Sequence, residues 1–455
     1  MRALVLAALA ACGDNFIPDV GVQLAALPGV TVTEKATATA GYRYFVLEFT
    51  QPVDHDDPSA GTFHQQVSLL HKDTGAPLVV ATSGYWDYIV DNPAELTLML
   101  GANQISIEHR FFAGSTPNPT DWSKLTIAQM AADQHAIVTA LHAIYGGPAI
   151  ATGASKGGMT AMYYRRFFPD DVVATVPYVA PESFAAPDSR YPPFLDTVGG
   201  DQYATCRQAI RDAATEMLAN RRAAMESRAA ADATENYYSY TRIALGPAVE
   251  AAIDQLEWSF WQYRGVVFCG AIPPVTATDD DLWGFLNDYS PPFLDDDAYT
   301  EAFAPYYFQA YYQLGYPDPG ASYLQPYLMY SDADYVGSFP TAEPVFDGGA
   351  AMHDIDDFVE NDGDHLLFIY GQWDPWTAGA FALGGAKDAL QLIQAQGTHT
   401  SHIAALADSD RAAALARLAA WTGVTPIIPA QRESVPEPRV PSALVRALRA
   451  RRATR

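Results

Sequence analysis

The sequence is poor in basic residues, in cysteines and in long hydrophobic runs. Its 455 residues include 27 lysines and arginines against 53 aspartates and glutamates, which gives a formal net charge of −26. Nucleic acid and anionic membrane surfaces would repel such a chain, so we exclude nucleic acid as a partner. An acidic surface remains compatible with a cationic substrate, or with solubility alone.

Only the first residues form a continuous hydrophobic run, and no other segment is apolar over a membrane-spanning length. Met1-Arg2 followed by the apolar stretch to Ala11 is typical of a short export signal, residues 1–11. The stretch ends in Leu-Ala-Ala-Cys, as in the bacterial lipobox, where the cysteine after the cleavage site carries diacylglycerol. We therefore expect an exported cell-envelope lipoprotein, attached to a membrane only through a lipid anchor on Cys12, with plain secretion as the alternative.

With three cysteines in the chain, assigning Cys12 to the lipid leaves Cys206 and Cys269 as a possible disulfide pair. Export to an oxidising compartment would favour that pair. The alternative is two inert, buried thiols.

The order of the predicted elements indicates an α/β protein. Residues 42–49 and 65–70 alternate or run apolar as strands do, and they predict an antiparallel start. Buried strands and amphipathic helices then alternate, with strands at 77–84, 104–109, 149–152 and 172–179 and helices at 126–144 and 157–168. This alternation implies a parallel sheet with helices on both faces.

The pattern changes between residues 182 and 362, where alanine-rich and aromatic-rich stretches predict a mostly helical insertion. The sheet pattern resumes afterwards, so the core comprises residues 30–181 and 363–423. Residues 424–455 are rich in proline and arginine, which is typical of a linker followed by a basic tail.

The strongest functional pattern is Gly153-Ala154-Ser155-Lys156-Gly157, a Gly-x-Ser-x-Gly at the predicted junction between a strand and a helix. In α/β-hydrolases the nucleophilic serine occupies such a strained turn, and the flanking glycines keep neighbouring side chains from colliding there. The following helix directs its N-terminal N–H groups toward the developing oxyanion. We predict an α/β-hydrolase fold with a mostly helical cap insertion and Ser155 as nucleophile.

The acid and the base should follow the serine in the order acid, then histidine. Asp374 comes directly after the predicted strand 365–370 and is expected to orient the imidazole. Only His399 and His402 follow it in the chain. We favour His399 as the base because it is nearer the end of the last predicted strand, residues 389–395.

The oxyanion hole is expected to combine two backbone N–H groups, those of Lys156 and Tyr85. Tyr85 lies in the loop after the strand 77–84. The Lys156 side chain is expected to be solvated, so that this residue would act through its backbone alone.

Five segments carry a wider pattern: Gln51 to His55, Glu108 to Phe112, Gly153 to Thr160, Tyr178 to Pro181, and Asp374 to Trp376. Together they resemble the bacterial secreted tripeptidyl aminopeptidases, relatives of lysosomal prolyl carboxypeptidase and the dipeptidyl peptidases. The resemblance implies a capped α/β-hydrolase with the triad Ser155, Asp374 and His399. It also implies no metal or cofactor, and release of short peptides, tripeptides in particular, from free N-termini. The family tends to have Gly-Ala after the catalytic histidine, where this chain has Thr400-Ser401.

An aminopeptidase must bind the α-ammonium of its peptide substrate, and a carboxylate is the natural partner. Glu108, at the end of its predicted strand, is our substrate-binding candidate. Alternatively, Glu108, His109 and Arg110 form an internal ion pair that fixes the loop, and an acidic run at 279–281 or 295–297 binds the ammonium instead.

Two other functions stay open at this point, because a fold does not determine a substrate. One is a carboxylesterase or lipase with the same triad, and the other is a non-catalytic envelope lipoprotein. The acidic and aromatic insertion favours a polar, peptide-sized cleft over a lipase site.

Overall fold

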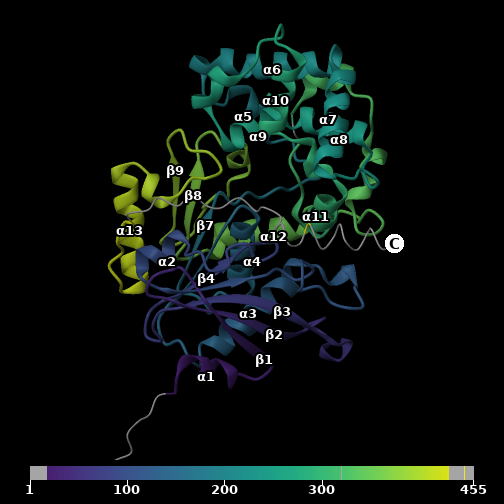
Figure 1. The fold of residues 1–455 in the computed structure, drawn as a ribbon. Coiled ribbons are helices and arrows are strands. Elements are labelled where there is room, and N and C mark those ends of the chain that lie inside the picture. Colours follow the sequence, from purple (N-terminus) through teal and green to yellow (C-terminus); the bar gives the residue numbers. More distant parts are fainter. Residues whose placement is uncertain (1–17, 319, 430–444, 446–455) are drawn as a thin grey trace, which may run out of the picture.

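In the computed structural model, residues 18–318, 320–429 and 445 are described, and a central sheet organises them (Figure 1). The sheet has the strand order β1-β2-β3-β5-β4-β6-β7-β8-β9. The strands are β1 (Val30–Lys35), β2 (Arg43–Pro52), β3 (Thr62–His71), β4 (Leu78–Thr82), β5 (Asn103–Ile107), β6 (Ala149–Ala154), β7 (Ala174–Tyr178), β8 (Leu367–Gly371) and β9 (Leu390–Gln394). The predicted signal peptide, Cys12 and most of the predicted tail lie outside the described residues.

The sheet is antiparallel at one end and parallel through the rest. β1, β2, β3 and β5 pair in antiparallel fashion, whereas β5, β4, β6, β7, β8 and β9 pair in parallel. The strands β4, β5, β7 and β8 are buried along their whole length, which explains why β4 and β8 are mostly apolar in sequence. In β5 the buried residues include the polar side chains of Asn103, Gln104 and Ser106. The edge strand β1 was missed by sequence pattern because most of its residues are exposed.

Helices cover both faces of the sheet, and a hydrophobic layer lies under each. On one face lie α1 (Val20–Ala25), α3 (Ile127–Leu141), α4 (Lys156–Phe167) and α12 (Ala350–Asp362). On the other face lie α2 (Glu95–Leu100) and α13 (Asp408–Thr422). This is the α/β-hydrolase fold that the sequence predicts. No helix in the described part of the chain is long and apolar enough to cross a membrane.

The helical insertion forms a cap above the carboxyl ends of the parallel strands (Figure 1). Its helices are α5 (Pro192–Thr197), α6 (Ala204–Ala219), α7 (Arg222–Asn236), α8 (Leu245–Asp254), α9 (Leu256–Tyr263), α10 (Asp279–Tyr289) and α11 (Asp297–Gln309). The helices α5 to α10 surround a hydrophobic cluster of their own, which includes Met217, Phe260, Trp261 and Leu286. The helix α11 packs instead against Tyr85, Trp86 and Phe112 of the core. The helix α12 also packs against the core, at α4 and β8.

One covalent link lies inside the cap, where Cys206 of α6 is bonded to Cys269 with the two Cα atoms 5.4 Å apart. The linked residues are 63 positions apart in sequence. Closing a loop of this length restricts the unfolded chain, and such links typically add about 2–4 kcal/mol to the free energy of unfolding. The bond holds the segment after α9 against α6.

Candidate active site

Ser155 occupies a sharp turn between β6 and α4, with φ 53° and ψ −127°. A residue with a side chain adopts positive φ only where the surrounding structure compels it. Here α4 begins so close to the sheet that a Cβ on Gly153 would lie 2.4 Å from the Gly157 carbonyl carbon, and one on Gly157 would lie 2.2 Å from the Thr82 oxygen. Both glycines of the Gly-x-Ser-x-Gly pattern are therefore required by close backbone contact.

Asp374 and His399 form a hydrogen-bonded pair. Asp374 follows β8 and is fully buried, and its Oδ2 lies 2.7 Å from His399 Nδ1. Its other carboxylate oxygen accepts the N–H of Trp376 at 3.2 Å. The His399 backbone N–H donates to the carbonyl of Gln262 at the end of α9, 2.8 Å away, so the cap also fixes the histidine loop. With Nδ1 bound to Asp374, Nε2 is the ring nitrogen left for the serine.

Ser155 and His399 line the same cleft, which has a volume of about 730 Å³ and lies between core and cap. This volume falls within the range of ligand pockets in proteins, about 300–1,000 Å³. Aromatic rings form much of its wall; they belong to Tyr85, Tyr263, Tyr289, Phe293, Tyr299, Phe303, Tyr306 and Trp376. Polar side chains from the cap, among them Ser259 and Gln262, interrupt the aromatic wall.

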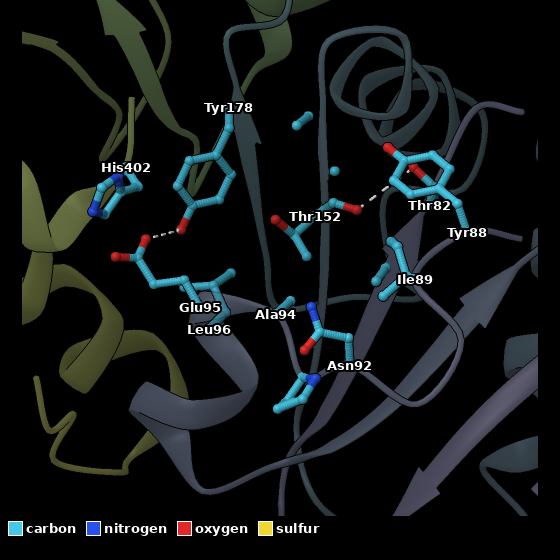
Figure 2. Close-up of a pocket in the computed structure, with 14 residues that line it drawn as sticks. Thr82, Tyr88, Ile89, Asn92, Ala94, Glu95, Leu96, Thr152, Tyr178 and His402 are labelled. Atoms are coloured by element: carbon cyan, nitrogen blue, oxygen red, sulfur yellow. Dashed lines mark hydrogen bonds between the residues drawn. The ribbon is translucent and has the colours of Figure 1, made fainter. Parts of the chain in front are cut away.

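His402 does not line this cleft. It borders a separate cavity of about 70 Å³, beside the hydrogen-bonded pair Tyr178 and Glu95 (Figure 2). Its Nδ1 lies 3.0 Å from the Thr400 carbonyl oxygen, and its Nε2 is buried without a hydrogen-bond partner in the described chain. The structure therefore brings His399, and not His402, to the cleft that contains Ser155.

The two expected oxyanion donors differ in their present partners. Lys156 is the first residue of α4, so its N–H is among those that helix geometry leaves without an intrahelical acceptor. The Tyr85 N–H, by contrast, donates to Ser83 Oγ at 3.1 Å. Tyr85 lines the cleft as expected, but its N–H would have to exchange that bond for a substrate oxygen.

The Lys156 side chain is buried, which contradicts the expectation that it is solvated. The residue is 2% exposed, and its Nζ donates to the Gly84 carbonyl at 2.5 Å. The same ammonium lies 5.3 Å from the ring centres of both Tyr85 and Phe112. Burial lowers the pKa of Lys156 well below its ordinary value. The side chain is enclosed because α4 starts directly beneath the loop of residues 83–88, which we name the oxyanion loop.

Glu108 is also an internal residue, which contradicts its assignment as the substrate-binding carboxylate. It is 4% exposed and does not line the cleft. Its carboxylate accepts the N–H of Asp87 at 3.1 Å, the N–H of Ser115 at 3.1 Å and the Ser115 hydroxyl at 2.8 Å. Burial raises the pKa of Glu108 to about 7. Glu108 thus connects the end of β5 to the oxyanion loop.

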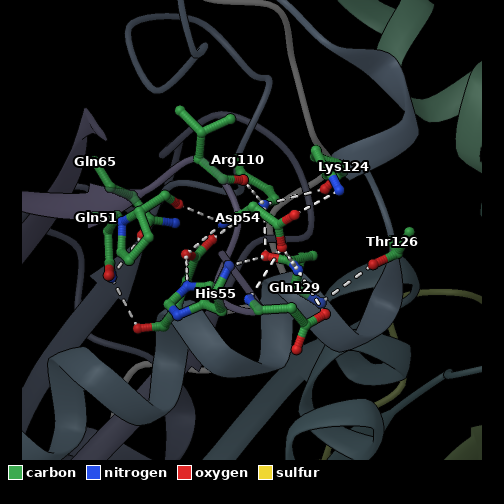
Figure 3. Close-up of polar contacts among 12 residues, drawn as sticks. Gln51, Asp54, His55, Gln65, Arg110, Lys124, Thr126 and Gln129 are labelled. Atoms are coloured by element: carbon green, nitrogen blue, oxygen red, sulfur yellow. Dashed lines mark hydrogen bonds and ion pairs between the residues drawn. The ribbon is translucent and has the colours of Figure 1, made fainter. Parts of the chain in front are cut away.

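Arg110 pairs with Asp133 of α3 rather than with Glu108. Figure 3 shows Arg110 together with Asp54, His55 and Gln129 in one group of polar contacts. Two of its nitrogens lie 2.7 Å from the two Asp133 oxygens, and neither side chain is exposed. Arg110 also donates to the carbonyls of Pro52 and Val53, and His55 Nε2 lies 2.7 Å from Asp133. The segments 51–55 and 108–112 therefore meet in one buried network.

A backbone bond from the His109 N–H to the Tyr85 carbonyl, 2.8 Å long, joins this network to the oxyanion loop in addition to the bond between Glu108 and Asp87. Asp133 is a supporting residue that the sequence analysis missed. An aspartate among the mostly apolar residues of the predicted helix 126–144 was the available indication, because an unpaired carboxylate would be costly on its buried face.

The two acidic runs of the insertion begin helices. The Asp281 side chain caps α10 together with Thr278, and Asp279 pairs with Arg221. In the second run Asp296 caps α11, and Asp297 accepts hydrogen bonds from Ser239 and Thr241. None of these residues lines the cleft. The carboxylate that does line it is Asp288, at the other end of α10, which the sequence analysis did not single out.

Similarity to known proteins agrees with this geometry. The sequence profile of the PS-10 peptidase S37 family matches residues 15–452. The prolyl tri/tetrapeptidyl aminopeptidase of Streptomyces mobaraensis is 39% identical over 435 residues, which cover 93% of this chain and 89% of that protein.

Two solved structures illustrate more distant similarity. A proline iminopeptidase from Mycobacterium smegmatis is 12% identical with a TM-score of 0.33, covering 85% of this chain and 97% of that one. Rv0554 from Mycobacterium tuberculosis is 14% identical with a TM-score of 0.37, covering 83% of this chain and 99% of that one. Similarity this low carries no argument about function. The family profile and the Streptomyces relative, by contrast, are similar enough to identify the family. The chain belongs to the PS-10 peptidase S37 family of serine peptidases.

Proposed function

We propose that this peptidase releases short peptides, tripeptides in particular, from free N-termini through an acyl-enzyme on Ser155. The observation that carries the proposal is the placement of Ser155 and His399 in one capped cleft, with His399 bound to the buried Asp374. The name of the Streptomyces relative supports the choice of substrate, since that protein is a tri/tetrapeptidyl aminopeptidase.

In the proposed reaction His399 Nε2 accepts the Ser155 hydroxyl proton while the serine oxygen attacks the scissile carbonyl. The tetrahedral intermediate collapses, the peptide C–N bond breaks, and His399 passes the proton to the leaving amine. Water then hydrolyses the acyl-enzyme with His399 again as base. Asp374 keeps the imidazole oriented and stabilises its cationic form through the 2.7 Å bond to Nδ1.

The oxyanion of the intermediate lies at the N-terminus of α4, where the Lys156 N–H and the helix dipole stabilise it. The Tyr85 N–H joins when it exchanges Ser83 Oγ for the substrate oxygen. Glu108 and the buried Lys156 ammonium hold the oxyanion loop in position, from Asp87 and from Gly84. Neither side chain needs to touch the substrate.

The wall of the cleft favours peptides over lipids. Besides its aromatic rings it presents Ser183, Gln262, Asn287 and two charged residues, Arg264 and Asp288. Amide and ammonium groups of a peptide can use such partners, whereas an acyl chain cannot. An esterase remains the second candidate, because the same triad cleaves activated esters.

The cysteines motivate a further proposal, that the chain is exported and carries a lipid on Cys12. Its support is the disulfide between Cys206 and Cys269, because such bonds persist in oxidising compartments.

The substrate class is tested with chromogenic tripeptides that carry either a free or an acetylated N-terminus, and with a short-chain ester. We expect release from the free-amine tripeptide and little from the acetylated one, because the acetyl group removes the cation. Ser155→Ala should lower kcat by at least about 10³-fold. Ester cleavage without peptide release would assign the protein to the esterases instead.

The identity of the base is tested by replacing each late histidine with alanine. His399→Ala should lower kcat by about 10³-fold or more, because the serine loses its proton acceptor. His402→Ala, the matched control, should keep kcat within about tenfold, since His402 lines a different cavity. Loss of activity in the His402 variant alone would refute the assignment.

The buried Glu108 predicts a pH effect on stability. Its pKa is about 7 in the folded protein and lies near 4.5 in the unfolded chain. Between pH 4.5 and 7 Glu108 is protonated in the folded state and ionised in the unfolded state. The free energy of unfolding therefore falls as the pH rises through this range, by up to about 3 kcal/mol. Glu108→Gln should flatten this slope in denaturant titrations. The exposed Glu48→Gln serves as control, and identical slopes in wild type and Glu108→Gln would contradict the prediction.

The lipid anchor is tested by growing the producing bacterium with radiolabelled palmitate. We expect label in the wild-type chain and none in Cys12→Ala, because that residue supplies the thiol. An unlabelled wild-type chain recovered from the culture medium would favour plain secretion.

A further inference from the structure

The cleft contains few charged side chains apart from the catalytic pair. Among the described residues that line it, these are Lys156, Arg264 and Asp288. The Lys156 ammonium is buried against the Gly84 carbonyl and cannot face a ligand without leaving it. The cleft therefore presents one available cation and one carboxylate, both supplied by the cap.

Asp288 lies in the last turn of α10 and is exposed. It forms no hydrogen bond or ion pair with any residue of the described chain, although Arg264 lines the same cleft. An exposed carboxylate in a substrate cleft with no ion pair of its own is suited to bind a cation. The C-terminal end of α10 adds to this, because the last carbonyls of a helix carry partial negative charge.

The neighbouring Asn287 provides an independent observation. Its side-chain oxygen is buried and has no hydrogen-bond partner within the described chain, although the residue lines the cleft. A buried acceptor without a partner costs about 1–3 kcal/mol, so such atoms usually face a ligand or water. Asn287 and Asp288 are thus consecutive residues in the last turn of α10 that line the cleft and carry a neutral and a charged oxygen acceptor.

We propose that Asp288 and Asn287 form the subsite that binds the α-ammonium of the substrate. An ammonium has three N–H donors, and the carboxylate and the amide oxygen accept two of them. The inference rests on the proposed exopeptidase function and adds to it the residues that recognise the free N-terminus. It replaces Glu108, whose carboxylate is occupied inside the core.

Such a subsite would also limit the length of the released peptide. An extended residue spans about 3.3–3.6 Å, so a fixed ammonium site and a fixed Ser155 accept only a narrow range of residue numbers between them. The cap supplies one end of this interval and the core supplies the other.

Arg264 provides a matched control residue whose charge is opposite to that of Asp288. Its guanidinium lies 5.6 Å from the ring centre of Tyr289 and 5.9 Å from that of Phe268, and the residue lines the same cleft. If the enzyme recognised a substrate carboxylate instead of an ammonium, Arg264 would be the residue to bind it.

The test compares wild type, Asp288→Asn, Asn287→Leu and Arg264→Gln on three substrates: a free-amine tripeptide, its acetylated form and a short-chain ester. Asp288→Asn should raise KM for the free-amine tripeptide by about 10-fold to 100-fold, the range expected for one hydrogen bond to a charged group. Ester hydrolysis should stay within about twofold of wild type, which also shows that the variant is folded. Asn287→Leu should raise the same KM by a smaller factor.

Two outcomes would overturn the subsite: an unchanged KM in Asp288→Asn, or a raised KM in Arg264→Gln alone. Both leave the exopeptidase function intact as long as wild type prefers the free amine. If wild type cleaves the acetylated tripeptide equally well, the proposed function fails first, and the ammonium subsite fails with it.

Discussion

The site depends on the close contact between the start of α4 and the ends of β4 and β6. At Gly84, Gly153 and Gly157 a Cβ atom would lie within 3.0 Å of neighbouring backbone. This contact holds Ser155 at positive φ and brings the first N–H groups of α4 to the mouth of the cleft. It also encloses the Lys156 side chain, whose ammonium binds the Gly84 carbonyl. The nucleophile, the helix terminus and the oxyanion loop are thus parts of one packing arrangement.

Behind this contact lies a polar scaffold instead of a purely apolar core. Arg110 and Asp133 are both fully buried, and removing one member of such a pair typically costs about 3–5 kcal/mol because the other charge is left without a partner. Glu108 connects the same region to Asp87 of the oxyanion loop. Buried hydrogen-bonded groups have little freedom to move. This scaffold therefore fixes the oxyanion loop in the position that a reaction at Ser155 requires. Two sequence segments that characterise the family resemblance, 51–55 and 108–112, have this supporting role.

The cap contributes to the chemistry as well as to binding. It has its own hydrophobic cluster and its own disulfide, so it can present a rigid surface to the core. Gln262 at the end of α9 accepts the backbone N–H of His399, and Tyr263 packs against the imidazole. The end of α10 presents Asp288 and Asn287 to the cleft. A change in cap position would therefore alter both the orientation of the base and the recognition of the substrate.

The fold class, the strand, turn and helix around Ser155, and the late aspartate after a strand could all be predicted from the sequence. These features depend on local patterns: hydrophobic periodicity, glycine spacing and the order of motifs along the chain. The tertiary structure decided which late histidine meets Asp374 and that Lys156 and Glu108 point inward. It also decided that Asp133 pairs with Arg110 and that Asp288 lines the cleft. Each of these depends on segments far apart in the sequence, and only their packing determines whether a charged side chain faces the cleft, another side chain or water.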